Sequence, residues 1–85
     1  MTDTLIEFPA DIAVKAMGLN APDFESLISA LALPHIDDEA ATVTTLPSKA
    51  GKYVSVSVRF KAKNIQQLEA VYTALKAEPR VLYTL

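Results

Sequence analysis

Apolar and polar side chains alternate without a break over residues 53–63 of this chain. The even positions carry valines, a phenylalanine and an alanine, whereas the odd positions carry a tyrosine, serines and basic residues. A period of two with β-branched residues on one side is typical of a half-buried strand, whose other face meets water or a partner. We therefore predict a strand here, and we place these side chains on its open face as a candidate interface: Tyr53, Ser55, Ser57, Arg59 and Lys61.

Three further segments have the character of strands. Residues 11–18 alternate apolar side chains with a second side that carries Lys15 and Met17. Residues 42–47 are rich in β-branched side chains, and residues 81–85 form a last apolar stretch before the end of the sequence. Between the strands at 42–47 and 53–63, Gly51 supplies a turn.

Two segments instead repeat apolar side chains with the period of a helix. In the first, Phe24 begins a stripe that recurs three, four and seven residues later. Pro22 suits the first position of this helix, because its missing N–H needs no partner there, and Pro34 ends the helix at about Leu33. The second helix follows Asn64, a favourable N-cap, and Gln67 three residues later completes a capping box.

The order of elements is β-α-β-β-α-β. With right-handed crossovers, this order predicts a ferredoxin-like α+β sandwich, in which a four-stranded antiparallel sheet of spatial order 4-1-3-2 carries both helices on one face. The length of 85 residues fits a single domain. We expect residues 1–10 to be a lead-in segment, of which Leu5, Ile6 and Phe8 pack on the core.

The composition limits the chemistry and the location of the protein. There is no cysteine, which excludes disulfides, cysteine-based zinc sites and thiol nucleophiles and suits a reducing compartment. No apolar run approaches the roughly 20 residues that span a bilayer, and the start of the chain does not resemble a secretory signal. We therefore expect a cytoplasmic protein that does not enter a membrane.

Charge is distributed unevenly along the chain. Through Thr42 there are eight acidic residues against Lys15, a local charge of −7, and from Val43 onward there are seven basic residues against two acidic ones, a local charge of +5. Two interpretations remain open. The two halves attract each other in the folded domain, or the basic half forms a surface for an anionic partner.

Candidate catalytic and metal-binding residues are few. Asp37, Asp38 and Glu39 are consecutive, whereas calcium loops space their ligands at alternate positions around a glycine turn. His35 follows a helix, where a surface or capping role is expected. The segment at 48–52 lacks the first glycine and the spacing of a phosphate loop. We predict no metal, no cofactor and no enzymatic activity.

A small-ligand site is predicted where the first strand meets the first helix. Gly18 permits close approach of a ligand to the backbone, and the following helix directs free N–H groups and a partial positive charge toward the same place. Lys15 adds a cation, which suits a small anionic metabolite. The alternative is an ordinary turn in which Gly18 only relieves backbone strain. The residues of this candidate site are Lys15, Met17, Gly18, Leu19 and Asn20.

Several of these motifs together resemble the YbeD-like family of small bacterial proteins. They are Lys-x-Met-Gly at residues 15–18, Ser-x-x-Gly-x-Tyr-x-Ser-Val at residues 48–56, and the helical segment at residues 65–72, with the lead-in Glu7-Phe8-Pro9. The resemblance covers nearly the whole chain. It implies a ferredoxin-like fold similar to ACT-type regulatory domains, which bind small effectors at the loop that Gly18 begins here.

We therefore expect a regulatory or adaptor domain that acts through a small ligand or a protein partner. The alternative is an RNA-binding module on the open face of the sheet. That face lacks the paired aromatic residues on which bases stack, and the net charge of the chain is −2, so nucleic acid is the less expected partner. We also expect a homodimer through the open face or through a strand edge.

Overall fold

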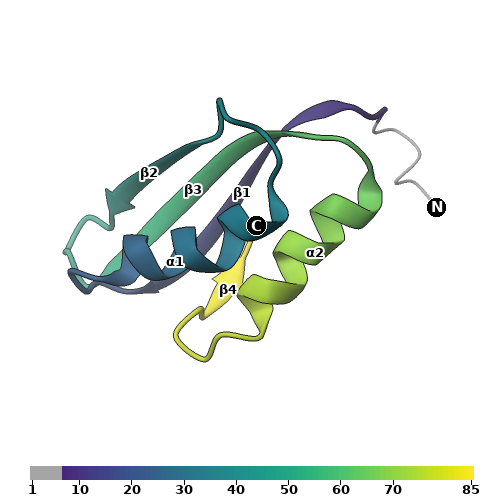
Figure 1. Cartoon of the computed structure of the whole chain (residues 1–85). Coiled ribbons are helices and arrows are strands. Elements are labelled where there is room, and N and C mark those ends of the chain that lie inside the picture. Colours follow the sequence, from purple (N-terminus) through teal and green to yellow (C-terminus); the bar gives the residue numbers. More distant parts are fainter. Residues whose placement is uncertain (1–6) are drawn as a thin grey trace.

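A computed structural model describes residues 7–85 of the chain. Figure 1 shows a curved sheet with both helices lying across one of its faces. The elements follow the predicted β-α-β-β-α-β order. They are β1 (Ala10–Leu19), α1 (Phe24–Ala32), the 3-10 helix η2 (Leu33–His35), β2 (Thr42–Pro47), β3 (Tyr53–Ala62), α2 (Ile65–Lys76) and β4 (Tyr83–Thr84).

The sheet confirms the predicted topology. Its strand order is β2-β3-β1-β4, and each neighbouring pair is antiparallel. The two ten-residue strands β1 and β3 pair along their whole length at the centre of the sheet. Because side chains alternate between the two faces of a strand, this register sets every odd position of β1 beside an odd position of β3.

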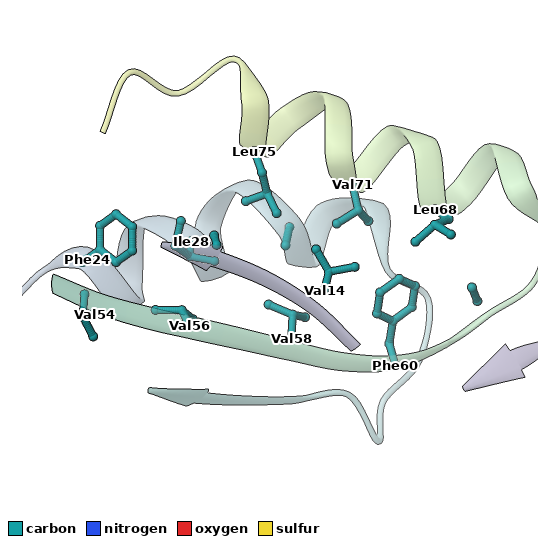
Figure 2. Packing of buried hydrophobic residues seen from close by; sticks show 13 residues of the cluster. Val14, Phe24, Ile28, Val54, Val56, Val58, Phe60, Leu68, Val71 and Leu75 are labelled. Atoms are coloured by element: carbon teal, nitrogen blue, oxygen red, sulfur yellow. The ribbon is translucent and has the colours of Figure 1, made fainter. Parts of the chain in front are cut away.

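The core lies between the sheet and the two helices. The even positions of β3 are buried as predicted, and the helices contribute side chains such as Phe24, Ile28, Val71 and Leu75, all at most 1% exposed. Figure 2 shows these side chains pointing toward one another from the sheet and from both helices. Phe8 of the lead-in packs against this core as predicted, whereas Leu5 and Ile6 lie outside the described residues.

The two helices begin differently. Asn64 caps α2 as predicted, since its Oδ1 accepts the N–H of Gln67 at 2.9 Å. Gln67 Oε1 accepts the N–H of Lys63 at 2.7 Å, one residue before the position that a capping box requires. The prediction that Pro22 occupies the first position of α1 is wrong. The helix begins at Phe24, and Asp23 is its N-cap without a side-chain hydrogen bond to the helix.

One further boundary agrees with the prediction and one differs. The helix α1 ends at Ala32 with Leu33 as its C-cap, as predicted from Pro34, and the chain continues as the separate short helix η2, where a proline at the first turn lacks no hydrogen bond. The last strand covers only Tyr83–Thr84 instead of residues 81–85, although Leu82 and Leu85 also bond to β1 through Met17 and Lys15.

Candidate functional site

The open face of the sheet lies opposite the helices. It carries all five side chains that the sequence predicted as an interface, together with Lys15 and Met17. Met17 lies beside Ser55, and Lys15 lies beside Ser57. Lys15, Arg59 and Lys61 are exposed, and these neighbours are half-buried: Met17, Tyr53, Ser55 and Ser57. The alternation of polar and apolar positions therefore predicted correctly which side chains of β1 and β3 face away from the core.

One end of this face is apolar. The strand register places Leu46 of β2, Ser55, Met17 and Tyr83 of β4 in one row across the sheet. Leu85 lies opposite Lys15 and exchanges two backbone hydrogen bonds with it, which sets its side chain on the same face. We call Met17, Leu46, Tyr83 and Leu85 the apolar end. Leu46 is 71% exposed, Leu85 is 66% exposed and Tyr83 is 52% exposed.

Two small hollows flank Met17 at the apolar end. One has a volume of about 110 Å³ between Met17, Tyr83 and Leu85, with Lys15 at its border. The other has a volume of about 170 Å³ between Met17, Leu46 and Tyr53. Each hollow is the size of one or two aliphatic groups, so the apolar end offers separate sockets for two apolar side chains.

The other end of the open face is basic. We call Lys15, Arg59 and Lys61 the cationic strip. A shallow depression of about 740 Å³ lies over Ala13 between Arg59 and Lys61, with Asp11 at its margin. Asp11 lies directly opposite Lys61 in the strand register and offsets part of its charge. Within residues 7–85, the cationic strip takes part in no ion pair.

Asp38 borders the same depression but is already engaged. Its carboxylate accepts the backbone N–H of Lys61 at 2.9 Å and that of Ala40 at 2.9 Å. These two hydrogen bonds lower the pKa of Asp38. Its neighbour Asp37 forms an ion pair with Lys63. The acidic loop thus holds the connection before β2 in place against the end of β3.

The structure gives Gly18 a role that the sequence argument did not. Its φ is not positive, so it relieves no backbone strain, and it is buried on the helix side of the sheet. A Cβ at this position would lie 2.5 Å from the carbonyl oxygen of Arg80 and 2.7 Å from the Phe24 ring. The space that was expected to admit a ligand is therefore filled by the protein itself.

The other residues of the predicted ligand site do not converge on Gly18. Lys15 and Met17 lie on the opposite face of the sheet, and Leu19 alternates to that face as well. Asn20 Nδ2 donates to the carbonyl of Gly51 at 3.0 Å, which ties the loop to the turn between β2 and β3. The five residues therefore do not form one site: Lys15, Met17 and Leu19 lie on the open face, Gly18 is buried on the other side, and Asn20 contacts the turn.

The start of α1 is occupied by an ion pair. Arg80 donates two hydrogen bonds to the Asp23 carboxylate, at 3.0 and 2.8 Å, and its guanidinium lies 5.7 Å from the centre of the Phe24 ring. These hydrogen bonds lower the pKa of Asp23 and raise that of Arg80. Asp23–Arg80 and Asp37–Lys63 both join an acidic residue of the first half to a basic residue of the second, as the first interpretation of the charge asymmetry predicted.

Other predicted features have simple positions. His35 is exposed in η2. Residues 7–85 contain no group of three histidine, cysteine or carboxylate side chains placed to hold a metal ion. None of the helices in this part of the chain is long and apolar enough to cross a membrane.

Sequence reasoning missed three residues of the apolar end. Leu46, Tyr83 and Leu85 come from the two outer strands, and only the register shows that they meet at Met17. A signal was present in β2, where Thr42, Thr44 and Leu46 alternate on one face. The short β4 has no alternation long enough to assign a face.

Comparison with known proteins places this fold in a family. Residues 3–85 match the family described as "Protein of unknown function (DUF493)". A UPF0250 protein of Janthinobacterium sp. (strain Marseille) is 35% identical over 85 residues, covering 99% of this chain and 93% of the relative. A UPF0250 protein of Neisseria meningitidis serogroup B is 37% identical over 79 residues, covering 92% and 87%.

A solved structure has the same architecture. The solution structure of protein HP0495 from H. pylori aligns with a TM-score of 0.66 at 18% identity, covering 94% of this chain and 85% of that one. It supports the fold alone. The match over residues 3–85 and the relatives above 30% identity confirm the resemblance drawn from the sequence motifs: the chain belongs to the DUF493 family of YbeD-like proteins.

Proposed function

We propose that this domain is a non-enzymatic adaptor or regulatory module of the cytoplasm that binds a second protein through the open face of its sheet. The observation that carries the proposal is the apolar end, where Leu46, Tyr83 and Leu85 are more than half exposed around Met17. Contiguous exposed apolar side chains of this kind are typical of interaction sites.

The apolar end has the parts of a binding anchor. Burying an exposed leucine in an interface contributes roughly 1.5–3 kcal/mol, and a tyrosine supplies a large surface with little conformational entropy to lose. The two hollows beside Met17 receive side chains of a partner, and the polar Ser55 borders both of them. A buried apolar centre with a polar rim is the usual anatomy of a protein interface.

Asp23 and Asp38 serve the fold. Their pKa values are lowered by hydrogen bonds from Arg80 and from backbone N–H groups. A carboxyl group that serves as a general acid needs the opposite shift, so neither of these two groups is suited to that role.

The geometry supports a protein partner better than a small ligand. At the predicted ligand loop, Phe24 and Arg80 fill the space beside Gly18, and Asp23 already pairs with Arg80 at the start of α1. A small anion would therefore be repelled by the Asp23 carboxylate and would find no free space beside Gly18.

RNA binding on the open face is the second candidate. Tyr83 is an exposed aromatic residue on the same face as the cationic strip, as an RNA-binding sheet requires. The second aromatic residue, Tyr53, is half-buried, and the Lys52 ammonium lies 5.5 Å from the centre of its ring. This arrangement leaves one accessible aromatic platform, and the leucines of the apolar end have no role in it.

Capture from a lysate of the protein's own cell tests the proposal. The bait variants are wild type, the double variant Leu46→Ser with Leu85→Ser, and the control Leu33→Ser, which changes an exposed leucine of η2 outside the open face. We expect one protein to be retained by wild type and control but not by the double variant, and to bind the purified domain in calorimetry. The proposal would be contradicted if the double variant retained the protein as well as wild type does, or if nuclease treatment abolished its retention.

A further inference from the structure

We infer that the partner of the open face is an acidic protein segment, whose apolar side chains enter the two hollows of the apolar end while its carboxylates lie over the cationic strip. The inference rests on the proposed function and specifies the chemistry of the partner. It follows from the arrangement of apolar and basic side chains along the strands.

The strand register fixes that arrangement. Counting from the row of Met17 and Ser55, Lys15 is two residues away along the strands, Arg59 is four and Lys61 is six. At about 3.4 Å per residue, the three cations lie about 7, 14 and 20 Å from the row of Met17, and Lys15 shares its own row with Leu85. A single segment of a partner can therefore contact the sockets and the basic side chains together.

The cationic strip needs negative charge from outside. Within residues 7–85, the ion pairs engage Lys63 and Arg80 but none of Lys15, Arg59 and Lys61. Among the residues that the structure describes, Asp11 and Asp38 offset part of the charge of Lys61. Asp38 is satisfied by backbone N–H groups. Complementary charge guides the encounter and selects the partner, so carboxylates of the partner suit this strip.

A second copy of the chain does not match the open face. A two-fold axis parallel to the strands would bring the same rows of the two copies together, so that the cationic strip of one copy would lie against that of the other. An axis across the strands would place the cationic strip of one copy over the apolar end of the other. Since a two-fold interface must complement itself, this face is better matched by a different, acidic chain.

Nucleic acid matches only half of the face. Phosphates would pair with the cationic strip but would leave Leu46 and Leu85 exposed to water. The net charge of −2 also opposes nonspecific binding to a polyanion. An acidic protein segment with apolar side chains accounts for both ends of the face.

Selection from a phage-displayed library of random dodecapeptides on the immobilised wild-type domain tests the inference without assuming a sequence. We expect the selected peptides to combine Asp or Glu with Leu, Ile, Phe or Met. As synthetic peptides, they should bind Arg59→Glu and Lys15→Glu at least tenfold more weakly than wild type. Lys76→Glu is the matched control, because it makes the same charge change at the end of α2 and should bind as wild type does.

A charge swap separates recognition from any effect on folding. A selected peptide whose acidic residues are replaced by lysine should bind Arg59→Glu more tightly than it binds wild type. Higher salt should weaken the original pair, because it screens exposed charges.

The outcomes distinguish the inference from the proposed function. Selected peptides that lack acidic residues but lose binding to the Leu46→Ser, Leu85→Ser variant would overturn the inference and leave the proposed function standing. The inference and the proposed function would both be overturned if no peptide were enriched on wild type over the Leu46→Ser, Leu85→Ser variant. They would also be overturned if peptides bound equally well to variants of the apolar end and of the cationic strip. If a 20-nucleotide RNA bound more tightly than any selected peptide, nucleic-acid recognition would replace the inference and the proposed function. If the wild-type domain dimerised and Arg59→Glu strengthened the dimer, the open face would be assigned to a second copy of the chain.

Discussion

Gly18→Ala tests the packing between the sheet and the start of α1. An ideal Cβ at Gly18 would lie 2.5 Å from the Arg80 carbonyl oxygen and 2.7 Å from two carbons of the Phe24 ring. Ordinary contact begins at 3.4 Å, so the new methyl group is too close by 0.9 Å to the oxygen and by 0.7 Å to the ring. Neither neighbour yields easily, because one is backbone and Phe24 is 1% exposed.

The expected cost follows from this crowding. Overpacking a core by one methyl group typically destabilises a protein by 1–3 kcal/mol, and two rigid neighbours place Gly18→Ala at about 2 kcal/mol. In a domain of this size each kcal/mol lowers the melting temperature by about 4–8 °C, so we expect a decrease of roughly 8–16 °C. Urea unfolding followed by circular dichroism measures the same change as a lower midpoint with an unchanged slope.

Two further variants identify the cause. Gly51→Ala adds the same methyl group where nothing lies within 4 Å but where φ is +78°, so it should cost only about 1 kcal/mol of backbone strain. Phe24→Leu removes part of the ring that crowds Gly18. The double variant of Gly18→Ala with Phe24→Leu should therefore be more stable than the sum of its single variants predicts, by at least about 0.5 kcal/mol.

The reasoning fails if Gly18→Ala changes stability by less than about 0.5 kcal/mol, which is the scatter of ordinary surface substitutions. It also fails if the coupling with Phe24→Leu is absent. The first result would mean that the space beside Gly18 is open, and the predicted small-ligand loop would then regain its physical basis. The second would mean that the Phe24 ring does not crowd the new methyl group.

Four further predictions concern the sheet and its surroundings. Val56→Asp buries an unpaired carboxylate and should lower the free energy of unfolding by several kcal/mol, whereas Ser55→Asp should cost far less, and equal costs would contradict the face assignment. Because hydrogen bonds lower the pKa of Asp38, its carboxylate stabilises the fold above about pH 4 and loses that effect on further acidification. Asp38→Ala should therefore be less stable at pH 7 and lose less stability between pH 4 and 2 in urea unfolding. Elemental analysis should find no stoichiometric zinc or calcium in the purified protein, and one equivalent of either would contradict the sequence argument. Self-association along the sheet edge that β4 forms predicts a dimer mass by light scattering at about 100 μM, which a monomer mass would exclude.

Local patterns predicted the fold because each of its main elements carries its own signal. The alternation in β3, the apolar stripe that begins at Phe24 and the cap at Asn64 all depend on residues within one element. The spatial strand order then follows from general rules of handedness and connection. The weakest predictions were the start of α1 and the extent of β4, because the segments there are too short to show a period.

The candidate site depended on contacts between residues far apart in the sequence. Gly18 packs against Arg80, and Arg80 pairs with Asp23, 57 residues away. The residues next to Gly18 in the sequence therefore indicate only a turn or a ligand contact. The apolar end was hidden for the same reason, since Leu46 and Tyr83 meet Met17 only through the register of all four strands.

The surface of the outer strand β2 helps to separate folding from function. Thr42 and Thr44 show that exposed positions of this strand accept polar β-branched residues, and a threonine at position 46 would serve the fold equally well. Leu46 instead stands 71% exposed on the same face. Pro47 follows it. The N–H of the next residue, Ser48, donates to the carbonyl of Tyr53 and so points toward β3. Because N–H groups of successive residues point to opposite sides of a strand, the nitrogen of Pro47 lies on the free edge, where proline offers no donor. The strand thus weakens its own edge for pairing while it presents an apolar side chain on the open face, and that combination suits a partner that docks on the face of the sheet.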